Sequence, residues 1–561
     1  YILGIIFVII VDILQLIFPK YLGIITDELQ KSHITIKGIL RYIGIIIAVA
    51  AAAMIFKFLF RVYIFGAEKK LEYGLRKKLF DHLLTLSPSF YNTHKTGDLM
   101  ALATNDINAI RMAMGTGVVL ATDTIFLTIS VLIIMIKTID FKLTLLALIP
   151  MPIIAIMSLK FGKIVRNRFT AVQEAFSSLT DKVQETLSGI RVIKSYVQEM
   201  DEIKNFNNTS KNAFEKNMKL AKLWGIAFPF VQLIATISFI IVLGYGGTQV
   251  ILGSISLGDF IAFNTYLGML IWPFMAFGWI VDLIQRGNAS LDRLNDIMRV
   301  KPEIIDNNPD DMEEINGHIV MDNITFSYAY DQEPVLKDID LDIQAGNTLA
   351  VIGGTGSGKT TLVNLIPRMY EKYNGKIYID GHDVYKIPLS LLRRNIGYVP
   401  QDNFLFSATI KENIAFGKTD ATMDEVIKAS KIAMVYDDII SFPDGFDTIV
   451  GERGVTLSGG QKQRISIARA LVMNPKILIL DDSLSAVDTQ TEEKILNGLN
   501  KFMKDRTSII ISHRVSTIEH ADEIIFIGDG VIKERGTHKD LINLKGHYCN
   551  LYQKQLLEEI D

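Results

Sequence analysis

The residues best suited to chemistry form a glycine-rich stretch in the second half of the chain, directly after a short apolar run. From Gly353 to Thr360 the residue types follow the spacing G-x-x-x-x-G-K-T. Glycines allow successive backbone N–H groups to converge on one phosphate, and the helix that follows offers its N-terminus to the same anion. Lys359 supplies a positive charge for the β/γ-phosphates, and the Thr360 hydroxyl suits Mg²⁺.

This spacing predicts a binding site for a nucleoside triphosphate with Mg²⁺. The alternative, a glycine-rich strand-to-helix turn without a ligand, is less favoured because the strand, the turn and the Lys-Thr pair occur in register. The residues expected to wrap the phosphates are Gly353, Gly354, Thr355, Gly356, Ser357, Gly358, Lys359, Thr360 and Thr361.

Two further motifs follow the glycine-rich stretch. The apolar run Ile477–Leu480 ends in Asp481 and Asp482, and an acid at this place in a P-loop protein holds Mg²⁺ directly or through water. Upstream of it, the run Ser458–Gln461 opens a predicted helix, with Ser458 as N-cap by residue type. Exposed N–H groups at such a start can bind a second phosphate, although on its own the pattern equally fits an ordinary capped helix.

The elements that position these motifs alternate between strand-like and helical patterns from His318 onward, which is typical of an α/β nucleotide domain. The expected strands are Ile319–Phe326, Leu349–Ile352, Lys376–Ile379, Ile396–Val399, Ile477–Leu480, Ser508–Ile511 and Glu523–Ile527. Before them, the polar, proline-bearing run 299–317 is expected to be a linker.

The first half of the chain is strongly apolar, and the mean hydropathy of the whole chain is positive although a fifth of its 561 residues are charged. This mixture predicts a membrane part joined to a soluble part. Six stretches are long enough to cross a bilayer, because about 20 apolar residues suffice as a helix. They cover about 1–26, 39–65, 117–136, 143–159, 223–252 and 261–284. The first begins at Tyr1 without the basic stretch or cleavage site of a signal peptide, so we expect a membrane helix there.

The connections between the spans predict the topology. Those after the second and fourth spans, about 66–114 and 160–222, are long, basic and helical in pattern, whereas the short loops contain few Lys or Arg residues. The positive-inside rule therefore places the long connections in the cytoplasm. Six spans return the chain to that side, so we expect a multi-pass protein of the cytoplasmic (inner) membrane whose nucleotide domain lies in the cytoplasm.

Charged residues occur within or at the ends of the spans, where charge is costly. Asp12 is expected to be the most cavity-like of them. Lys57, Arg61 and Asp282 fit substrate contact and interfacial anchoring equally well. The single cysteine, Cys549, excludes a disulfide framework. The net charge of −3 and the lack of a basic block with interleaved aromatic residues argue against a nucleic-acid partner.

The motifs occur in an order that resembles the nucleotide-binding domain of ATP-binding cassette (ABC) transporters. They run GGTGSGKTT, YVPQ, LSGGQKQR, ILILDD, SAVD and ISH. The six spans and the segment Lys95–Asp106 also resemble ABC exporters of the multidrug type, so the likeness covers essentially the whole chain. It implies an all-α polytopic membrane domain over 1–298, with long cytoplasmic helical extensions, and a C-terminal α/β P-loop ATPase domain over 318–561.

The resemblance also implies roles for single residues. Tyr328 would stack on adenine, with Tyr330 as a nearby competitor. Gln401 would contact Mg²⁺ and the attacking water. His513 would reach the γ-phosphate. Together with Asp482, Gln401 and His513 form the predicted catalytic group, while Thr360, Gln401 and Asp481 form the predicted metal group.

The remaining motifs are implied to act between two chains. Ser458, Gly459, Gly460 and Gln461 would contact ATP held by a partner chain, and Asp488 would lie at that interface. Glu452 resembles the loop that contacts the cytoplasmic helices.

One position departs from the family pattern. Members that hydrolyse ATP well have glutamate directly after the strand-end aspartate, whereas this chain has Asp482. A catalytic base must reach the water that it deprotonates, and aspartate is one methylene shorter. A tolerated conservative change is possible, but we favour a weak, ATP-retaining site. The chain then resembles the degenerate half of a heterodimeric ABC exporter, whose intact LSGGQ completes the hydrolytic site of a different partner.

We therefore predict ATP-driven efflux of amphipathic organic compounds through a dimer in the lipid bilayer. The aromatic residues of the sixth span suit such a substrate, although they also suit packing. They are Tyr266, Trp272, Phe274, Phe277 and Trp279. The alternatives are a slowly hydrolysing homodimer that exports lipid or peptide, and an ATP-gated channel or regulatory subunit.

Overall fold

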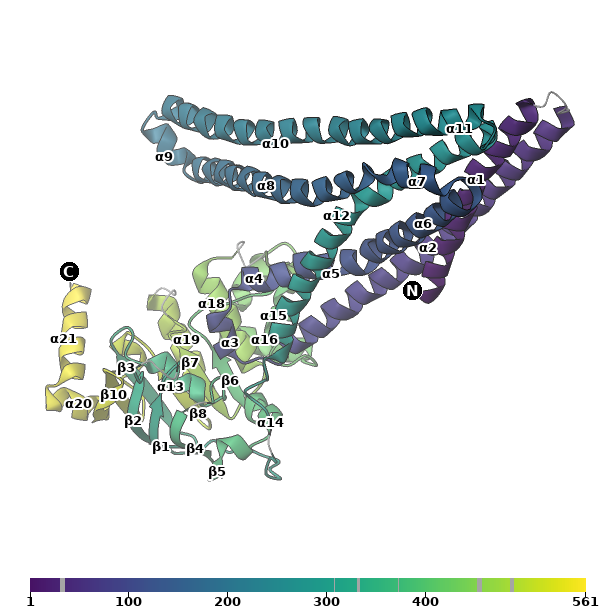
Figure 1. The fold of residues 1–561 in the computed structure, drawn as a ribbon. Coiled ribbons are helices and arrows are strands. Elements are labelled where there is room, and N and C mark those ends of the chain that lie inside the picture. The colour runs from purple at the N-terminus through teal and green to yellow at the C-terminus, as the bar shows by residue number, and fades with distance from the viewer. Residues whose placement is uncertain are drawn as a thin grey trace. The chain divides into compact units, whose positions relative to one another are not determined.

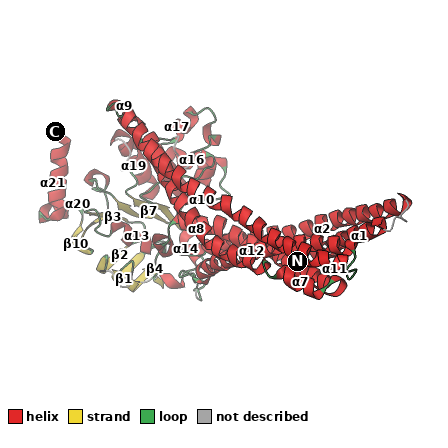
Figure 2. Ribbon diagram, turned by 45° about the horizontal axis from the view of Figure 1, so that its top comes forward, coloured by secondary structure: helices red, strands yellow, loops and turns green. Residues whose placement is uncertain are grey.

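The protein is described here from a computed structural model, which describes residues 1–30, 36–306, 308–329, 333–371, 373–451, 457–484 and 489–560. Two units are formed by the contacts within the chain. The first contains Tyr1–Leu84 and Thr96–Val300, and the second contains Thr85–Lys95 and Lys301–Asp561. All described strands belong to the second unit (Figure 1, Figure 2).

All regular secondary structure in the described residues of the first unit is helical. Its helices are α1 (Ile2–Gln30), α2 (Ile36–Leu83), α4 (Thr96–Ala101), α5 (Ile107–Met112), α6 (Val118–Ile134), α7 (Phe141–Leu148), α8 (Met151–Ser188), α9 (Ile190–Ser195), α10 (Glu199–Ile241), α11 (Gly247–Ile251) and α12 (Leu257–Arg299). Short π-helical turns join α4, α5 and α6 into one rod that ends at Ile139, and another turn joins α10 to α11.

Within the described part of the chain, the helices and their joining turns form six rods that are long and apolar enough to cross a membrane, so the predicted all-α polytopic domain is confirmed. Each of the six apolar stretches expected from the sequence coincides with one rod. Polar caps mark where two of them begin: the Asp140 carboxylate accepts from the Leu143 N–H at 2.5 Å, and the Ser256 hydroxyl accepts from the Asp259 N–H at 2.9 Å.

Helices α8 and α10 explain the long basic connection predicted from the sequence. They contain 38 and 43 residues, which at about 1.5 Å per residue is roughly twice the thickness of a hydrocarbon core. The two lie side by side and are joined by the short α9 (Figure 1). Each therefore combines a membrane span with a long polar extension.

Over its described residues the second unit contains two sheets. Its strands are β1 (Ile319–Phe326), β2 (Leu336–Ile343), β3 (Thr348–Gly353), β4 (Tyr373–Ile379), β5 (His382–Asp383), β6 (Ile396–Val399), β7 (Ile477–Asp481), β8 (Thr507–Ile511), β9 (Glu523–Gly528) and β10 (Val531–Gly536). Strands β9, β3, β8, β7 and β6 are neighbours in a parallel sheet that the antiparallel β10 extends at one edge. The other sheet is antiparallel, in the order β2-β1-β4-β5.

The second unit also contains α-helices. They are α3 (Pro88–Thr93), α13 (Lys359–Leu365), α14 (Leu389–Arg394), α15 (Ile410–Ala415), α16 (Met423–Ile432), α17 (Tyr436–Ser441), α18 (Gly459–Leu471), α19 (Thr489–Met503), α20 (His538–Leu544) and α21 (His547–Ile560). The central strands β7 and β8 are buried along their whole length, as expected for parallel strands covered on both faces. This confirms the predicted α/β nucleotide domain, including all seven strands expected from the sequence.

Candidate functional site

The parallel sheet gathers the predicted site residues at one edge. Gly353 is the last residue of β3, and Asp481 is the last residue of β7 and is followed by Asp482. Gln401 lies just after β6, and His513 lies just after β8. Carboxyl ends of parallel strands meet at the same edge, where α/β proteins bind ligands. A cavity of about 340 Å³ lies there. It is lined by Tyr328, Val335, Thr355, Gly356, Ser357, Gly358, Lys359, Thr360, Thr361, Gln401, Asp481, Asp482, Ile511 and His513.

The glycine-rich turn forms a cradle between β3 and α13. Gly356 and Gly358 have φ of +77° and +101°, a conformation that side chains with a Cβ rarely adopt. At Gly358 space is also short, because a Cβ there would lie 2.8 Å from the Leu336 Cδ2 atom and 3.1 Å from the Val335 carbonyl oxygen. The Ser357 hydroxyl oxygen is buried in the cradle and has no hydrogen-bond partner among the residues that the structure describes. A phosphate oxygen would supply that partner.

Lys359 lies folded against the cradle. Its ammonium donates to the carbonyl oxygens of Gly353 and Gly354 at 3.0 and 2.8 Å. Burial lowers the pKa of this ammonium, although the nearby charges of Asp481 and Asp482 act to raise it. Three N–H donors on a flexible stem can exchange these carbonyl partners for phosphate oxygens, so the cradle fits an anion of high charge.

Thr360 and Asp481 together form a pair of oxygen donors. The Thr360 hydroxyl donates to the Asp481 carboxylate at 3.1 Å. Burial raises the pKa of the Asp481 carboxyl, and the neighbouring Asp482 adds to the rise. Among the described residues, no group of three or more His, Cys, Asp or Glu gathers to hold a metal. A hydroxyl and one carboxylate suit Mg²⁺, which keeps water and phosphate oxygens as its other ligands.

The backbone of Asp482 is held on both sides. Its N–H donates to the Ile511 carbonyl at 2.9 Å, and its carbonyl accepts from the Gln463 side chain at 3.3 Å. Its φ is +46°, in the left-handed region where aspartate is tolerated better than most residues. The half-buried side chain lines the cavity with Gln401 and His513, so the structure brings the three predicted catalytic residues together.

Tyr328 lies at the rim of the cavity. Its hydroxyl is 2.8 Å from the Thr361 hydroxyl, and its ring packs edge-on against Tyr370 with centroids 5.3 Å apart. The residue stays 42% exposed. An exposed aromatic face beside a phosphate cradle can stack on a base.

The Ser458–Gln461 motif forms the predicted helix start but lies outside the cavity. The Ser458 hydroxyl accepts from the Gln461 N–H at 3.2 Å, and the Gln461 side chain accepts from the Ser458 N–H at 3.0 Å. This capping box confirms Ser458 as the N-cap of α18. None of the four residues Ser458, Gly459, Gly460 and Gln461 lines the cavity.

Three predicted residues, Asp488, Glu452 and Tyr330, lie outside the described residues. Two residues that the sequence analysis missed do line the cavity, namely Val335 and Ile511. Tyr398, which was also missed, is not among the lining residues but places its hydroxyl 3.5 Å from the Asp481 carboxylate. Only their position at strand ends beside the motifs could have indicated them.

The four charged residues that the sequence analysis singled out in the membrane spans have three different surroundings. Asp12 was expected to be the most cavity-like, but this was wrong, because it is completely buried and is not among the residues that line the membrane cavity. Asp282 forms ion pairs with Arg166 at 2.7 Å and with Arg286 at 2.5 Å. Lys57 and Arg61, by contrast, line a separate cavity of about 790 Å³.

The aromatic residues of the sixth span do not form a single surface. Tyr266 is buried and donates its hydroxyl to the Leu16 carbonyl at 2.8 Å, so it has a packing role. Trp272 and Trp279 remain nearly half exposed and contact each other edge-on, with centroids 5.5 Å apart. From α12, it is Thr265 and Met269 that line the 790 Å³ cavity.

Comparisons with known proteins agree with this arrangement. Residues 1–274 match the family described as the ABC transporter transmembrane region, and residues 336–485 match the family described as ABC transporter. The chain is 43% identical over 558 residues to YheI of Bacillus subtilis (strain 168), a probable multidrug resistance ABC transporter ATP-binding/permease protein. This match covers 99% of the chain and 95% of the relative.

Two other proteins are similar over nearly the whole length. The multidrug resistance-like ATP-binding protein MdlA of Escherichia coli (strain K12) is 38% identical over 550 residues, covering 98% of the chain and 93% of the relative. The solved structure of a bacterial Atm1-family ABC exporter with ATP bound has a TM-score of 0.82 at 26% identity, and the match covers 98% of each chain.

Proposed function

The chain belongs to the ATP-binding cassette transporter family, and on this basis we propose that it is one half of a two-chain exporter for amphipathic organic compounds. As a family member it is an ATP-hydrolysing translocase. It is a multi-pass protein of the cytoplasmic membrane, with its ATPase domain in the cytoplasm. Its relatives YheI and MdlA are named for multidrug resistance, which supports a drug-like amphipathic cargo.

In this proposal the cradle residues bind the phosphates of ATP. The backbone from Gly353 to Thr361 wraps them, Lys359 releases its two carbonyl partners to contact them, and Tyr328 stacks on adenine. Thr360, Asp481 and Gln401 hold Mg²⁺, which when bound neutralises phosphate charge. His513 contacts the terminal phosphate from the end of β8.

A dimer is required because each ATP site needs parts from two chains. The Ser458–Gln461 helix start presents backbone N–H groups that suit a phosphate, yet it lies outside the chain's own cavity. A second half-transporter facing it would bring its own cradle to this helix start. ATP would then bind between two ATPase domains, and its hydrolysis would release them.

The observation that carries the asymmetric arrangement is Asp482. Its backbone is hydrogen-bonded at both the N–H and the carbonyl, so the chain cannot move forward to compensate for the short side chain. Aspartate therefore reaches about one methylene group less far into the cavity than glutamate would at this position, which weakens hydrolysis at this site. We propose that the partner has glutamate at the corresponding position and performs most of the turnover.

Two variants of this chain, each assembled with its partner, test the asymmetry. Lys359→Ala disables this chain's own weak site, so most steady-state ATPase activity should remain. Gly459→Asp places a negative charge at the helix start that faces the partner's ATP, so it should abolish most of the activity. Aspartate in a first helical turn is favourable for the helix itself, so the second variant is expected to fold.

Equal losses in the two variants would contradict the asymmetric arrangement and favour two equivalent sites. High turnover by this chain without any partner would contradict it as well. Substrate flux that runs only downhill and without ATP consumption would instead favour the channel alternative.

A further inference from the structure

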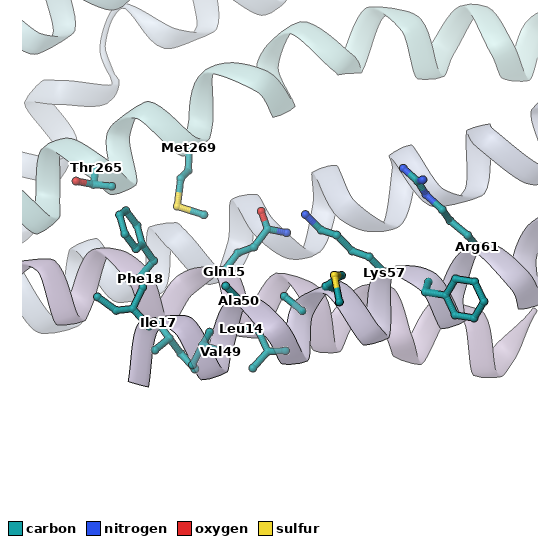
Figure 3. A pocket seen from close by; sticks show the side chains of 14 residues that line it. Leu14, Gln15, Ile17, Phe18, Val49, Ala50, Lys57, Arg61, Thr265 and Met269 are labelled. Atoms are coloured by element: carbon teal, nitrogen blue, oxygen red, sulfur yellow. The ribbon is translucent and has the colours of Figure 1, made fainter. Parts of the chain in front are cut away.

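The 790 Å³ cavity in the membrane unit has apolar walls and one cationic end. It lies between α1, α2 and α12, and most of its 14 lining residues are apolar. Phe18 and Ile17 lie toward one end, and Lys57 and Arg61 toward the other (Figure 3). Its size is within the range of sites that bind small organic molecules.

The two cations are placed to act together. Lys57 and Arg61 are one turn apart on α2, so they lie on the same helix face. Figure 3 shows both side chains extending to the same side of the helix, with the Gln15 amide of α1 near Lys57. An anionic group between them would receive donors from both residues.

The carboxylates near this end do not neutralise both charges. Lys57 interacts electrostatically with Asp12 of α1 and Asp123 of α6, and these carboxyl groups oppose its charge. Arg61 forms no ion pair within the described part of the chain, and it is an exposed residue that lines the cavity. A guanidinium held against apolar walls without a counter-charge favours an anionic ligand.

The length of the cavity indicates the rest of the ligand. From Ile46 to Arg61 the lining residues of α2 cover a stretch of 16 residues, or about 22 Å of helix. Apolar side chains of α1 and α2 line this length, including Val49, Ala50 and Phe58. This surface suits an alkyl or aryl tail much longer than a headgroup.

We propose that this cavity binds an amphiphile with a single anionic head, its charge held between Lys57 and Arg61 and its apolar tail lying along α1 and α2. The inference rests on the proposed export function and narrows its substrate class. A membrane lipid headgroup and a soluble amphiphilic carboxylate or sulfonate share this chemistry.

Equilibrium binding of 11-(dansylamino)undecanoate tests the site. The full-length chain is placed in phosphatidylcholine nanodiscs without ATP, and dansyl fluorescence is titrated. Because hydrogen bonds to charged groups are strong, Lys57→Gln and Arg61→Gln should each weaken binding about tenfold or more. Arg61→Lys keeps the charge and should retain most of the affinity for the probe. That result would show that the affinity lost in Arg61→Gln comes from the missing charge and not from misfolding.

Two controls separate charge recognition from general partition. Arg41→Gln removes a cation from the same helix outside the cavity and should leave binding unchanged. The uncharged methyl ester of the probe should bind more weakly, with no difference between wild type and the Gln variants. Equal affinities for acid and ester, or equal affinities of wild type and both Gln variants, would overturn the proposal.

A second arm distinguishes the source of the ligand. Nanodiscs in which phosphatidylglycerol replaces part of the phosphatidylcholine should lower the apparent probe affinity if the head belongs to a membrane lipid. An unchanged affinity assigns the site to soluble anionic amphiphiles. Because binding needs neither ATP nor the partner, probe binding without ATP-driven transport would refute the export function and leave the site intact.

Discussion

Replacing Asp482 by glutamate tests whether the short side chain limits hydrolysis. The backbone of Asp482 is fixed by the Ile511 carbonyl at 2.9 Å and the Gln463 side chain at 3.3 Å. The variant should therefore keep its backbone position and extend its carboxylate by one methylene, about 1.5 Å, into the cavity. A misplacement of about 1 Å costs on the order of 100-fold in rate, which corresponds to about 2.7 kcal/mol of activation free energy.

The same substitution should lower stability slightly. The φ of +46° suits aspartate better than glutamate, and a left-handed conformation costs a residue with a Cβ roughly 1–2 kcal/mol. Faster turnover combined with a lower unfolding temperature is therefore the expected signature. A general stabilisation of the ATPase domain would raise both quantities.

The assay is the steady-state ATPase activity of the purified chain in nanodiscs, where a second copy supplies the Ser458–Gln461 helix start. We expect Asp482→Glu to raise turnover about 100-fold, and Asp482→Asn to remain at or below the wild-type rate. Nucleotide affinity, measured in parallel, should not change. If wild type and Asp482→Glu turn over within threefold of each other while both bind ATP, the argument from side-chain reach is refuted.

Three further predictions concern the cradle. Gly358→Ala should abolish ATP binding, measured by titration with a fluorescent ATP analogue. The new Cβ would lie 2.8 Å from the Leu336 side chain, and the φ of +101° at this position disfavours any residue with a Cβ. Wild-type affinity in this variant would contradict the geometry. Tyr328→Ala should cost about 1–3 kcal/mol of nucleotide affinity whereas Tyr328→Phe keeps the stacking ring, and equal losses would assign the role to the hydroxyl instead. Because burial raises the pKa of Asp481, protonation competes with Mg²⁺, so the Mg²⁺ concentration for half-maximal ATPase should rise as pH falls. In the chain assayed without its partner, Asp481→Asn should remove that pH dependence together with most of the activity, and a pH-independent Mg²⁺ requirement in wild type would exclude Asp481 as the ligand.

Local chemistry explains why the cradle could be predicted from the sequence. Gly353 to Thr361 are consecutive, so their spacing alone determines which N–H groups converge. Asp481, Gln401 and His513 are distant in sequence, but each follows a recognisable apolar strand, and parallel strands end at one edge of a sheet. Apolar length was likewise enough to predict the membrane rods.

Features that depend on tertiary packing were missed. Strand β2 (Leu336–Ile343) alternates buried and exposed residues, but its exposed positions are charged and the sequence analysis did not assign it as a strand. Asp123, which interacts with Asp12 and Lys57, was also missed because the partners lie on three different helices. For the same reason, the sequence could not show that Asp12 is buried whereas Arg61 lines a cavity.

The grouping of Thr85–Lys95 with the ATPase unit was not foreseen either. Within that unit the Asn92 side chain donates to the Tyr370 hydroxyl at 3.1 Å, and Tyr370 packs edge-on against Tyr328. These contacts join residues about 280 positions apart in the chain. Helical periodicity around α3 carries no information about such a partner.

ATP-driven transport into inside-out vesicles tests the central claim most directly, namely that ATP bound at the cradle drives solute across the membrane. Vesicles containing this chain and its partner should accumulate a fluorescent amphiphile when MgATP is present outside. Accumulation should not occur with MgADP or when both cradles have Lys→Ala substitutions, at Lys359 in this chain. Vesicles that fill equally well with and without MgATP would contradict the account.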